Sequence, residues 1–366
     1  MIKKMLLFDL PILGTLTILT ILMFLHVFRT WNTENKDIYK KINEVVHAIL
    51  QGIFIVCYPF FVLKFSTGVA GIVQPTAEQD FDIMGLIGIF GAIIGLCLWM
   101  LSAKIGVKKH PERLETINNY DVWCKKFLDE YEVVLKRKVT HVLPPAVVCG
   151  VLAVFAMFQF IPIFGSKWQG YGMYFVVIIG VDFAFTFIIG DLIRLYNFQY
   201  MPPLAGELFK AGLTPDELDS FASTSVMVYG FAPFLLLDFP IFVIIMLITS
   251  VADGMASMFG IIAANKGKIH LFPKGSKKSI EGYIGGALFT ILSVYFGVAF
   301  SNFFGFSDPT VWTMELTLII AIALTIVVTI IDLFTVKIRL LDNWLNPLAC
   351  GLVLILILVI NGVPLI

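Results

Sequence analysis

The sequence predicts an all-α, polytopic integral membrane helix bundle with about ten transmembrane helices. Of its 366 residues, 58% are hydrophobic and only 14% are charged, whereas roughly a quarter of the residues of a soluble domain are charged. The apolar residues form runs long enough to cross about 30 Å of hydrocarbon. These runs show no strand-like alternation of apolar and polar residues, which favours helices over a β-barrel.

Ten apolar runs are candidate membrane spans. The run at the N-terminus is longer than the core of a signal peptide and lacks an A-x-A-like cleavage site, so we expect a retained helix. The sequence Asp238-Phe239-Pro240 interrupts two neighbouring runs and predicts either a tight hairpin or one kinked helix. The ten runs cover residues 5–28, 44–65, 82–103, 142–164, 171–191, 223–237, 239–263, 281–304, 313–335 and 345–363.

The order of spans and polar segments predicts three regions. Residues 1–110 form an N-terminal membrane region of three helices, to which the sequence assigns no role. Residues 111–141 form a basic cytoplasmic loop or interfacial helix, because they are rich in lysine and arginine. Residues 142–366 form a catalytic membrane domain of about seven helices.

The distribution of positive charge predicts the orientation in the membrane. With ten spans, the basic loops 104–141 and 264–280 fall on the same side, which the positive-inside rule makes cytoplasmic. Lys3 and Lys4 are the exception, since they would lie outside. The net charge is zero, so no basic excess indicates nucleic-acid binding. The five cysteines form no C-x-x-C pair, which indicates neither a disulfide framework nor a zinc site.

The segment 253–286 is the strongest candidate for chemistry. Ser279 is a suitable helix N-cap with Glu281 in the first turn, and a helix start offers unpaired backbone N–H groups to a phosphate. Gly282 is followed four residues later by another glycine, so two helices can approach closely there. The lysines that precede this helix start, and that would surround a phosphate, are Lys274, Lys277 and Lys278.

Asp253 is the acidic residue of the same segment. It ends a long apolar run and shares a helical face with Ser257. A carboxylate facing a lysine-lined phosphate site suits Mg²⁺-nucleotide chemistry, because Mg²⁺ takes one or two carboxylates together with phosphate oxygens. The alternative is that the lysines only orient the protein in the membrane and that Asp253 is solvated.

Other polar residues fall on the same predicted side of the membrane. Arg137, Lys138 and His141 precede the fourth span, and Asp191 and Arg194 end the fifth. Charged side chains near membrane depth are costly and are therefore candidates for function. The simpler alternatives are that Arg137 and Lys138 anchor the helix and that Asp191 and Arg194 form a helix-end ion pair.

Five short motifs resemble the dolichol kinase/phytol kinase family of CTP-dependent lipid kinases, which includes a CTP-using diacylglycerol kinase. Each motif alone has little specificity, but the five occur in the family's order over residues 130–360, and residues 1–110 lie outside the resemblance. The motifs are Arg137-Lys138-x-x-His141, Asp191-x-x-Arg194, Asp253-x-x-Ala256-Ser257-x-x-Gly260, Lys277-Lys278-Ser279-x-Glu281-Gly282 and Asp342-Asn343-x-x-x-Pro347.

The resemblance implies transfer of the γ-phosphoryl group of CTP to the hydroxyl of a membrane polyprenol or related lipid alcohol, at the cytoplasmic face. It implies Mg²⁺ held by Asp253 with Asp332, Asp342 or Asn343. Nucleotide phosphates would be bound by Lys274, Lys277, Lys278 and the Ser279 helix start, with Ser257, Glu281 and Gly282 close by. The charge on the transferred group would be stabilised by Arg137, Lys138 or Arg194, and the base would be His141 or Asp191.

Two alternatives stay open. CDP-diacylglycerol synthases share a D-x-x-A motif and a K-K-[ST]-x-E-G-x-x-G-G segment, which Gly285 and Gly286 complete here, but their P-G-H-G-G and D-R-x-D signatures are absent from this sequence. In that reaction a lipid phosphate attacks the α-phosphorus of CTP. The lesser alternative is a non-catalytic transporter, which internal repeats and broken helices at mid-membrane would indicate. The sequence predicts no oligomeric state.

Overall fold

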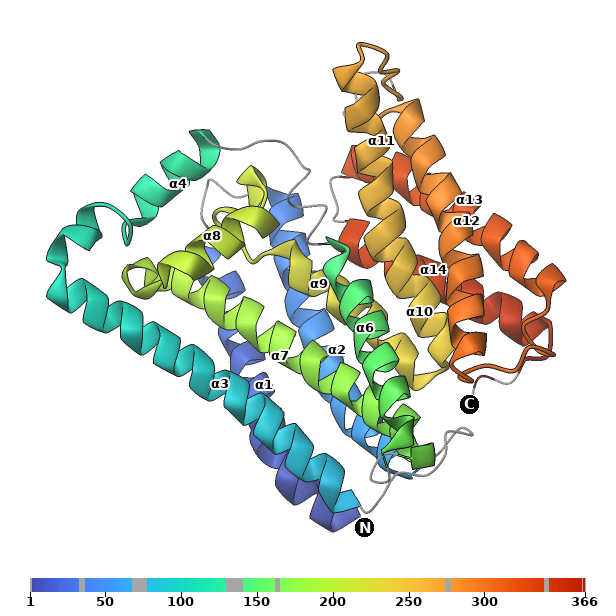
Figure 1. Cartoon of the computed structure of the whole chain (residues 1–366). Coiled ribbons are helices and arrows are strands. Elements are labelled where there is room, and N and C mark those ends of the chain that lie inside the picture. The colour runs from blue at the N-terminus through green and yellow to red at the C-terminus, as the bar shows by residue number, and fades with distance from the viewer. Residues whose placement is uncertain are drawn as a thin grey trace.

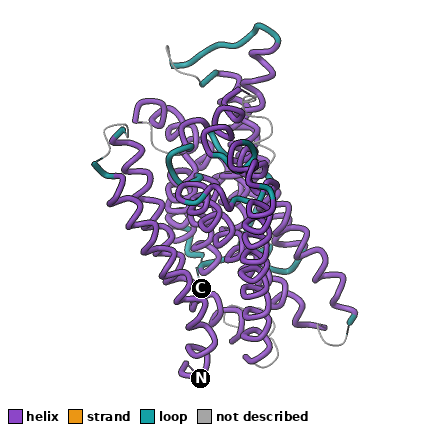
Figure 2. The backbone as a smooth tube through the Cα atoms, turned by 90° about the vertical axis from the view of Figure 1, so that its left-hand side faces the viewer, coloured by secondary structure: helices purple, strands orange, loops and turns teal. Residues whose placement is uncertain are grey.

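The structure, a computed structural model, describes residues 2–32, 37–67, 78–129, 141–161, 165–273, 278–338, 342–363 and 365. Within these ranges every named element is a helix, so the predicted all-α class is confirmed (Figure 1). Figure 2 shows the same helices joined by loops, seen from the side.

Nine helices in the described ranges are long and apolar enough to cross a membrane, which confirms the predicted polytopic bundle. The segment from Phe239 to Asn265 counts as one of the nine, because a π-helical turn joins α10 to α11. The elements that form these spans are α1 (Ile2–Thr30), α2 (Ile38–Thr67), α3 (Glu78–Lys109), α6 (Leu143–Met157), α7 (Trp168–Tyr196), α10 (Phe239–Leu247) with α11 (Asp253–Asn265), α12 (Ile280–Phe303), α13 (Met314–Ile338) and α14 (Asp342–Ile360).

The span predicted at 223–237 differs from the others. The structure forms α9 (Ser223–Phe231) and a 3₁₀ helix (Ala232–Leu236) there, and together they are shorter than the roughly 20 residues that a spanning helix needs. Every residue of α9 is buried. The prediction of a full span was therefore wrong, because hydropathy reports burial in apolar surroundings and not whether lipid or protein provides them.

A sharp break separates this short helix from α10. Asp238 is extended, with φ −151° and ψ 147°, and its carboxylate accepts a hydrogen bond of 2.8 Å from the backbone N–H of Phe239. Lys64 of α2 donates to the carbonyls of Leu236 and Leu237 at 2.9 and 3.1 Å, which satisfies the end of the 3₁₀ helix. Of the two predictions for this site, the structure therefore forms the hairpin and not one kinked helix.

The helices share one large apolar core. It joins Tyr58 of α2 with Phe185 of α7, Val226 of α9, Ile244 of α10 and Leu354 of α14. The N-terminal helices therefore pack directly against helices of the predicted catalytic region.

A second, smaller core holds the described part of the predicted 111–141 segment. Trp123 of α4 (Tyr120–Asp129) stacks on Phe127 at 5.7 Å and donates a 3.3 Å hydrogen bond to the carbonyl of Gly206 in α8 (Pro203–Gly212). Phe198 and Phe209 complete this cluster. The apolar face of α4 thus packs against the protein's own α8. The basic loop or interfacial helix at 111–141 stays a prediction.

The segments next to the basic loops can be followed in Figure 1. In Figure 1, α4 and the outer ends of α11 and α12 lie at the upper end, and both chain termini lie at the lower end.

Candidate functional site

The site is built on the contact between α11 and α12. A Cβ atom added at Gly282 would lie 3.0 Å from the carbonyl oxygen of Ala256, and one added at Gly286 would lie 3.2 Å from the Ala256 side chain. Only small residues allow this separation, so the predicted close approach of two helices is confirmed. It places the first turn of α12 against α11, one turn from Asp253.

Ser279 begins α12 as the sequence predicted. Its backbone is extended, with φ −126° and ψ 155°, and its Oγ accepts a 3.1 Å hydrogen bond from the N–H of Gly282. The preceding Lys278 points its Nζ to Asp332 of α13, 2.6 Å from Oδ1. A predicted phosphate ligand and a predicted metal ligand are therefore joined at the N-terminus of α12.

The loop between α11 and α12 folds back on this helix start. Glu281 Oε1 lies 2.5 Å from Nδ1 of His270, and its other oxygen accepts from the His270 N–H at 3.2 Å. The N–H of Phe272 donates to the Lys278 carbonyl at 3.0 Å. Glu281 thus anchors the loop. Lys274 and Lys277 lie outside the described residues.

Asp253 has a partner from a distant part of the chain. Its Oδ2 lies 3.6 Å from Nδ1 of His141, which precedes α6, and the side chains are 10% and 0% exposed. Directly before Asp253, the π-helical turn Ile248–Ala252 widens the helix, and such turns are frequent at functional sites. Two residues predicted to be catalytic are thereby brought together from segments far apart in sequence.

The remaining predicted residues near this pair are placed as follows. Ser257 lies one turn after Asp253 on α11 and is half-buried. Arg137, Lys138 and the side chain of Asp342 lie outside the described residues.

Asp191 and Arg194 form a separate, buried cluster. Both are 1% exposed, and Arg194 donates to Oδ1 of Asp191 at 3.0 and 2.7 Å. The other carboxylate oxygen accepts from the N–H of Ala222 at 2.7 Å. The predicted helix-end ion pair is present, and it ties α7 to the segment that leads into α9.

This segment explains why the cluster exists. Around residues 213–222 the chain is largely non-helical and partly buried, so the carbonyls that lie inside the protein need donors from it. Arg194 donates to the carbonyls of Glu217 at 3.2 Å, Leu218 at 2.6 Å and Ser220. The hydroxyl of Tyr120 also donates to the Leu218 carbonyl, and burial raises the pKa of Tyr120, which keeps that donor protonated.

Glu217 and Asn343 complete the cluster. Glu217 accepts from the N–H groups of Thr214 at 2.7 Å and Ser223 at 2.9 Å, so the capping box at Thr214 is formed. Asn343 of α14, a predicted metal ligand, is 3% exposed and donates to the Ser223 hydroxyl at 2.9 Å. Asn343 therefore fastens α14 to the start of α9.

Sequence reasoning missed a polar stripe on α2. Glu44 lies 3.3 Å from His26 of α1, and His47 lies 2.9 Å from the hydroxyl of Ser225 in α9. Gln51, one turn further along α2, is fully buried. The spacing i, i+3, i+7 within an apolar run was the signal, since it places these side chains on one helical face.

The chain matches no protein-family model, no curated protein and no solved structure.

Proposed function

We propose that the protein is a CTP-dependent lipid kinase, which transfers the γ-phosphoryl group of CTP to a polyprenol (dolichol-type) or related lipid alcohol at the cytoplasmic membrane face. The observation that carries the proposal is the His141–Asp253 pair, one helical turn along α11 from the contact between Ala256 and the first turn of α12. The imidazole of His141 could serve as a base and the carboxylate of Asp253 as a metal ligand. The nearby N-terminus of α12, with its lysines, could bind phosphate groups. The preference for CTP comes from the resemblance in sequence.

In the proposed reaction the alcohol oxygen forms a bond to the γ-phosphorus. The bond from that phosphorus to the bridging oxygen breaks, CDP leaves, and the hydroxyl proton passes to a base. His141 is the better candidate for this base, because both oxygens of Asp191 are occupied by Arg194 and by the N–H of Ala222. Asp253 would orient the imidazole.

The charge of the phosphates requires cations from the protein and from Mg²⁺. Mg²⁺ normally takes one or two carboxylates and completes its shell with phosphate oxygens and water. Asp253 offers one such carboxylate, and Asp332 or Asp342 would add the second. In the part of the chain that the structure describes, no group of three or more ligating side chains lies together. Phosphate oxygens of the nucleotide would therefore supply the remaining ligands of the proposed ion. Bound there, it would neutralise charge on the transferred group.

The phosphates would be held by the first turn of α12. Lys278 is directed to this end of the helix by its 2.6 Å contact with Asp332. The backbone N–H groups after Ser279 favour an anion, since the positive end of the helix dipole lies there. Arg194 and Asp191 would act on this site only by positioning α7 and the start of α9.

A CDP-lipid synthase is the second candidate, in which a lipid phosphate attacks the α-phosphorus and pyrophosphate leaves. One observation bears on it: Lys278, which belongs to the K-K-[ST]-x-E-G segment shared with those synthases, is held at the start of α12 by its contact with Asp332.

The test follows the label of CTP into lipid. Purified protein in lipid nanodiscs receives a polyprenol mixture or a lipid phosphate, with CTP labelled at the γ- or the α-phosphorus. We expect transfer to the alcohol from the γ position only, and at least a hundredfold slower in His141→Gln, a loss of the order of a general base. Lys40→Met, at an exposed ion pair with Asp219, is the matched control and should react normally. Transfer from the α position only would establish the synthase, and none from either, with ATP also tried, would favour a transporter.

A further inference from the structure

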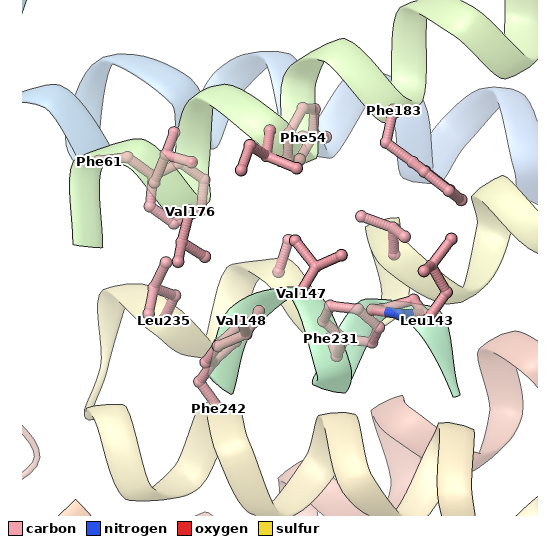
Figure 3. Close-up of a pocket in the computed structure, with 16 residues that line it drawn as sticks. Phe54, Phe61, Leu143, Val147, Val148, Val176, Phe183, Phe231, Leu235 and Phe242 are labelled. Carbon is pink, nitrogen blue, oxygen red and sulfur yellow. The ribbon is translucent and has the colours of Figure 1, made fainter. Parts of the chain in front are cut away.

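An apolar cavity lies between α2, α6, α7, α9 and α10, with an inner volume of about 90 Å³ (Figure 3). All of its lining residues are apolar. A hydrocarbon chain therefore meets no unpaired polar group there, whereas a hydroxyl or phosphate would lose its hydrogen bonds.

The cavity starts where the candidate site ends. Leu143, Pro144 and Val147 of α6 form part of its wall, and Leu143 follows His141 by two residues. His141 contacts Asp253 at 3.6 Å. The first turn of α6 thus has the polar pair at its start and the apolar cavity along its side.

The opposite wall comes from the N-terminal region. Phe54 and Phe61 of α2 face the same space as Leu143 and Val147 in Figure 3. The sequence assigned this region no role, and it lies outside the motifs of the resemblance. Here it contributes directly to a cavity shared with α6 and α7.

We infer that this cavity holds the apolar tail of the acceptor lipid, with the lipid hydroxyl at the His141–Asp253 pair. The inference rests on the proposed function and adds to it the place of the acceptor and a role for α2. A single flexible hydrocarbon chain suits this apolar cavity, because only its terminal hydroxyl needs hydrogen bonds. The His141–Asp253 pair beside the cavity could provide them. The acceptor class is therefore a lipid alcohol whose hydroxyl sits at the end of the chain.

Gly180 of α7 offers a direct way to fill the cavity. It lines the cavity, and a Cβ atom added there would meet no atom within 4 Å, so Gly180→Leu adds bulk without displacing the backbone. Gly150→Leu on α6 is the matched control, since that glycine also has no atom within 4 Å, is exposed, and is not part of the cavity. We expect Gly180→Leu to raise the KM for a long-chain alcohol about tenfold or more, the cost of overpacking an apolar site. The KM for CTP should stay unchanged in both variants.

A second measurement needs no turnover. A long-chain alcohol with a diazirine on its tail is photolysed with the native protein without CTP, and the labelled peptides are identified by mass spectrometry. We expect label on α6 and on the Phe54–Phe61 turns of α2, displaced by unlabelled alcohol and reduced in Gly180→Leu but not in Gly150→Leu. Label there without γ-phosphoryl transfer would support the lipid site while refuting the kinase.

Three outcomes would overturn the inference while leaving the kinase intact. One is normal transfer with label elsewhere in the chain. Another is equal lipid KM values for Gly180→Leu and Gly150→Leu. The third is displacement of the label by a phospholipid without a hydroxyl as effectively as by the alcohol, which would make the cavity a site for bulk bilayer chains.

Discussion

The replacement Arg194→Met distinguishes a structural role from a catalytic one. Methionine keeps much of the apolar volume but removes the guanidinium, which donates five hydrogen bonds to Asp191, Glu217, Leu218 and Ser220. The carboxylate of Asp191 then stays buried without its cation. The carbonyls of Glu217 and Ser220 lose their guanidinium donor, whereas the Leu218 carbonyl still accepts from a tyrosine hydroxyl.

The expected cost follows from these losses. Removing one partner of a buried ion pair costs about 3–5 kcal/mol. The Glu217 carbonyl still accepts from the Ser220 N–H at 3.2 Å, so the Ser220 carbonyl is the one that loses its donor, which adds about 1–3 kcal/mol. The sum is at least about 4 kcal/mol, which approaches the whole stability of many folded proteins. We therefore expect Arg194→Met to lower the melting temperature by roughly 10 °C or more.

The measurement is thermal unfolding of the purified protein in detergent, followed by tryptophan fluorescence, together with γ-phosphoryl transfer at low temperature. Adding Asp191→Asn should recover part of the loss, because the double variant no longer buries a lone charge and the amide oxygen can still accept from Ala222. Lys40→Met breaks an exposed pair with Asp219 and should cost less than about 1 kcal/mol. An Arg194→Met protein with an unchanged melting temperature and no transfer would refute the structural role and restore the catalytic one.

Three further predictions concern other residues. Asp253→Asn should lower γ-phosphoryl transfer at least about a hundredfold with little change in melting temperature, because the isosteric amide loses the charge that binds Mg²⁺; normal Mg²⁺-dependent rates would exclude it as a ligand. Lys278→Met should raise the KM for CTP about tenfold, whereas Asp332→Asn should change this KM only slightly. A large loss of kcat in Asp332→Asn would instead identify Asp332 as a metal ligand. Burial raises the pKa of Asp238 to about 6 from 3.8, so the native state favours the protonated carboxyl group more than the unfolded state does. The melting temperature should therefore fall as the pH rises from about 4 to 6 and then level off. Asp238→Asn should remove this dependence.

The sequence predicts the local features of the site well. Ser279 as an N-cap and the glycines that let α12 approach Ala256 depend on residues close together in the chain or on side-chain size. The sequence also predicts the membrane bundle, since length and hydropathy of a run suffice to identify a spanning helix. It fails at residues 223–237, where an equally apolar run is a short helix buried among other helices.

The sequence alone could not predict which distant residues contact each other, for a physical reason. Hydropathy fixes how deep a residue lies in the membrane, but the lateral arrangement of the helices depends on side-chain packing between them. His141 and Asp253, or Lys278 and Asp332, could therefore be assigned to one face of the membrane without being paired. The π-helical turn before Asp253 carries no residue signal of its own either.

This limit also explains why one predicted active site becomes two clusters. The sequence places Asp191, Arg194 and Asn343 on the same predicted side as Asp253 and Lys278, yet the structure uses the first three to fasten a buried, non-helical segment to α7 and α14. Depth alone cannot separate a charge that serves a substrate from one that satisfies buried backbone, because both must lie where water is scarce. The two groups of residues differ in the atoms that they contact. The first group binds carbonyls, N–H groups and a hydroxyl of the chain, so its replacement should change stability, whereas replacement of Asp253 or Lys278 should change turnover and nucleotide binding.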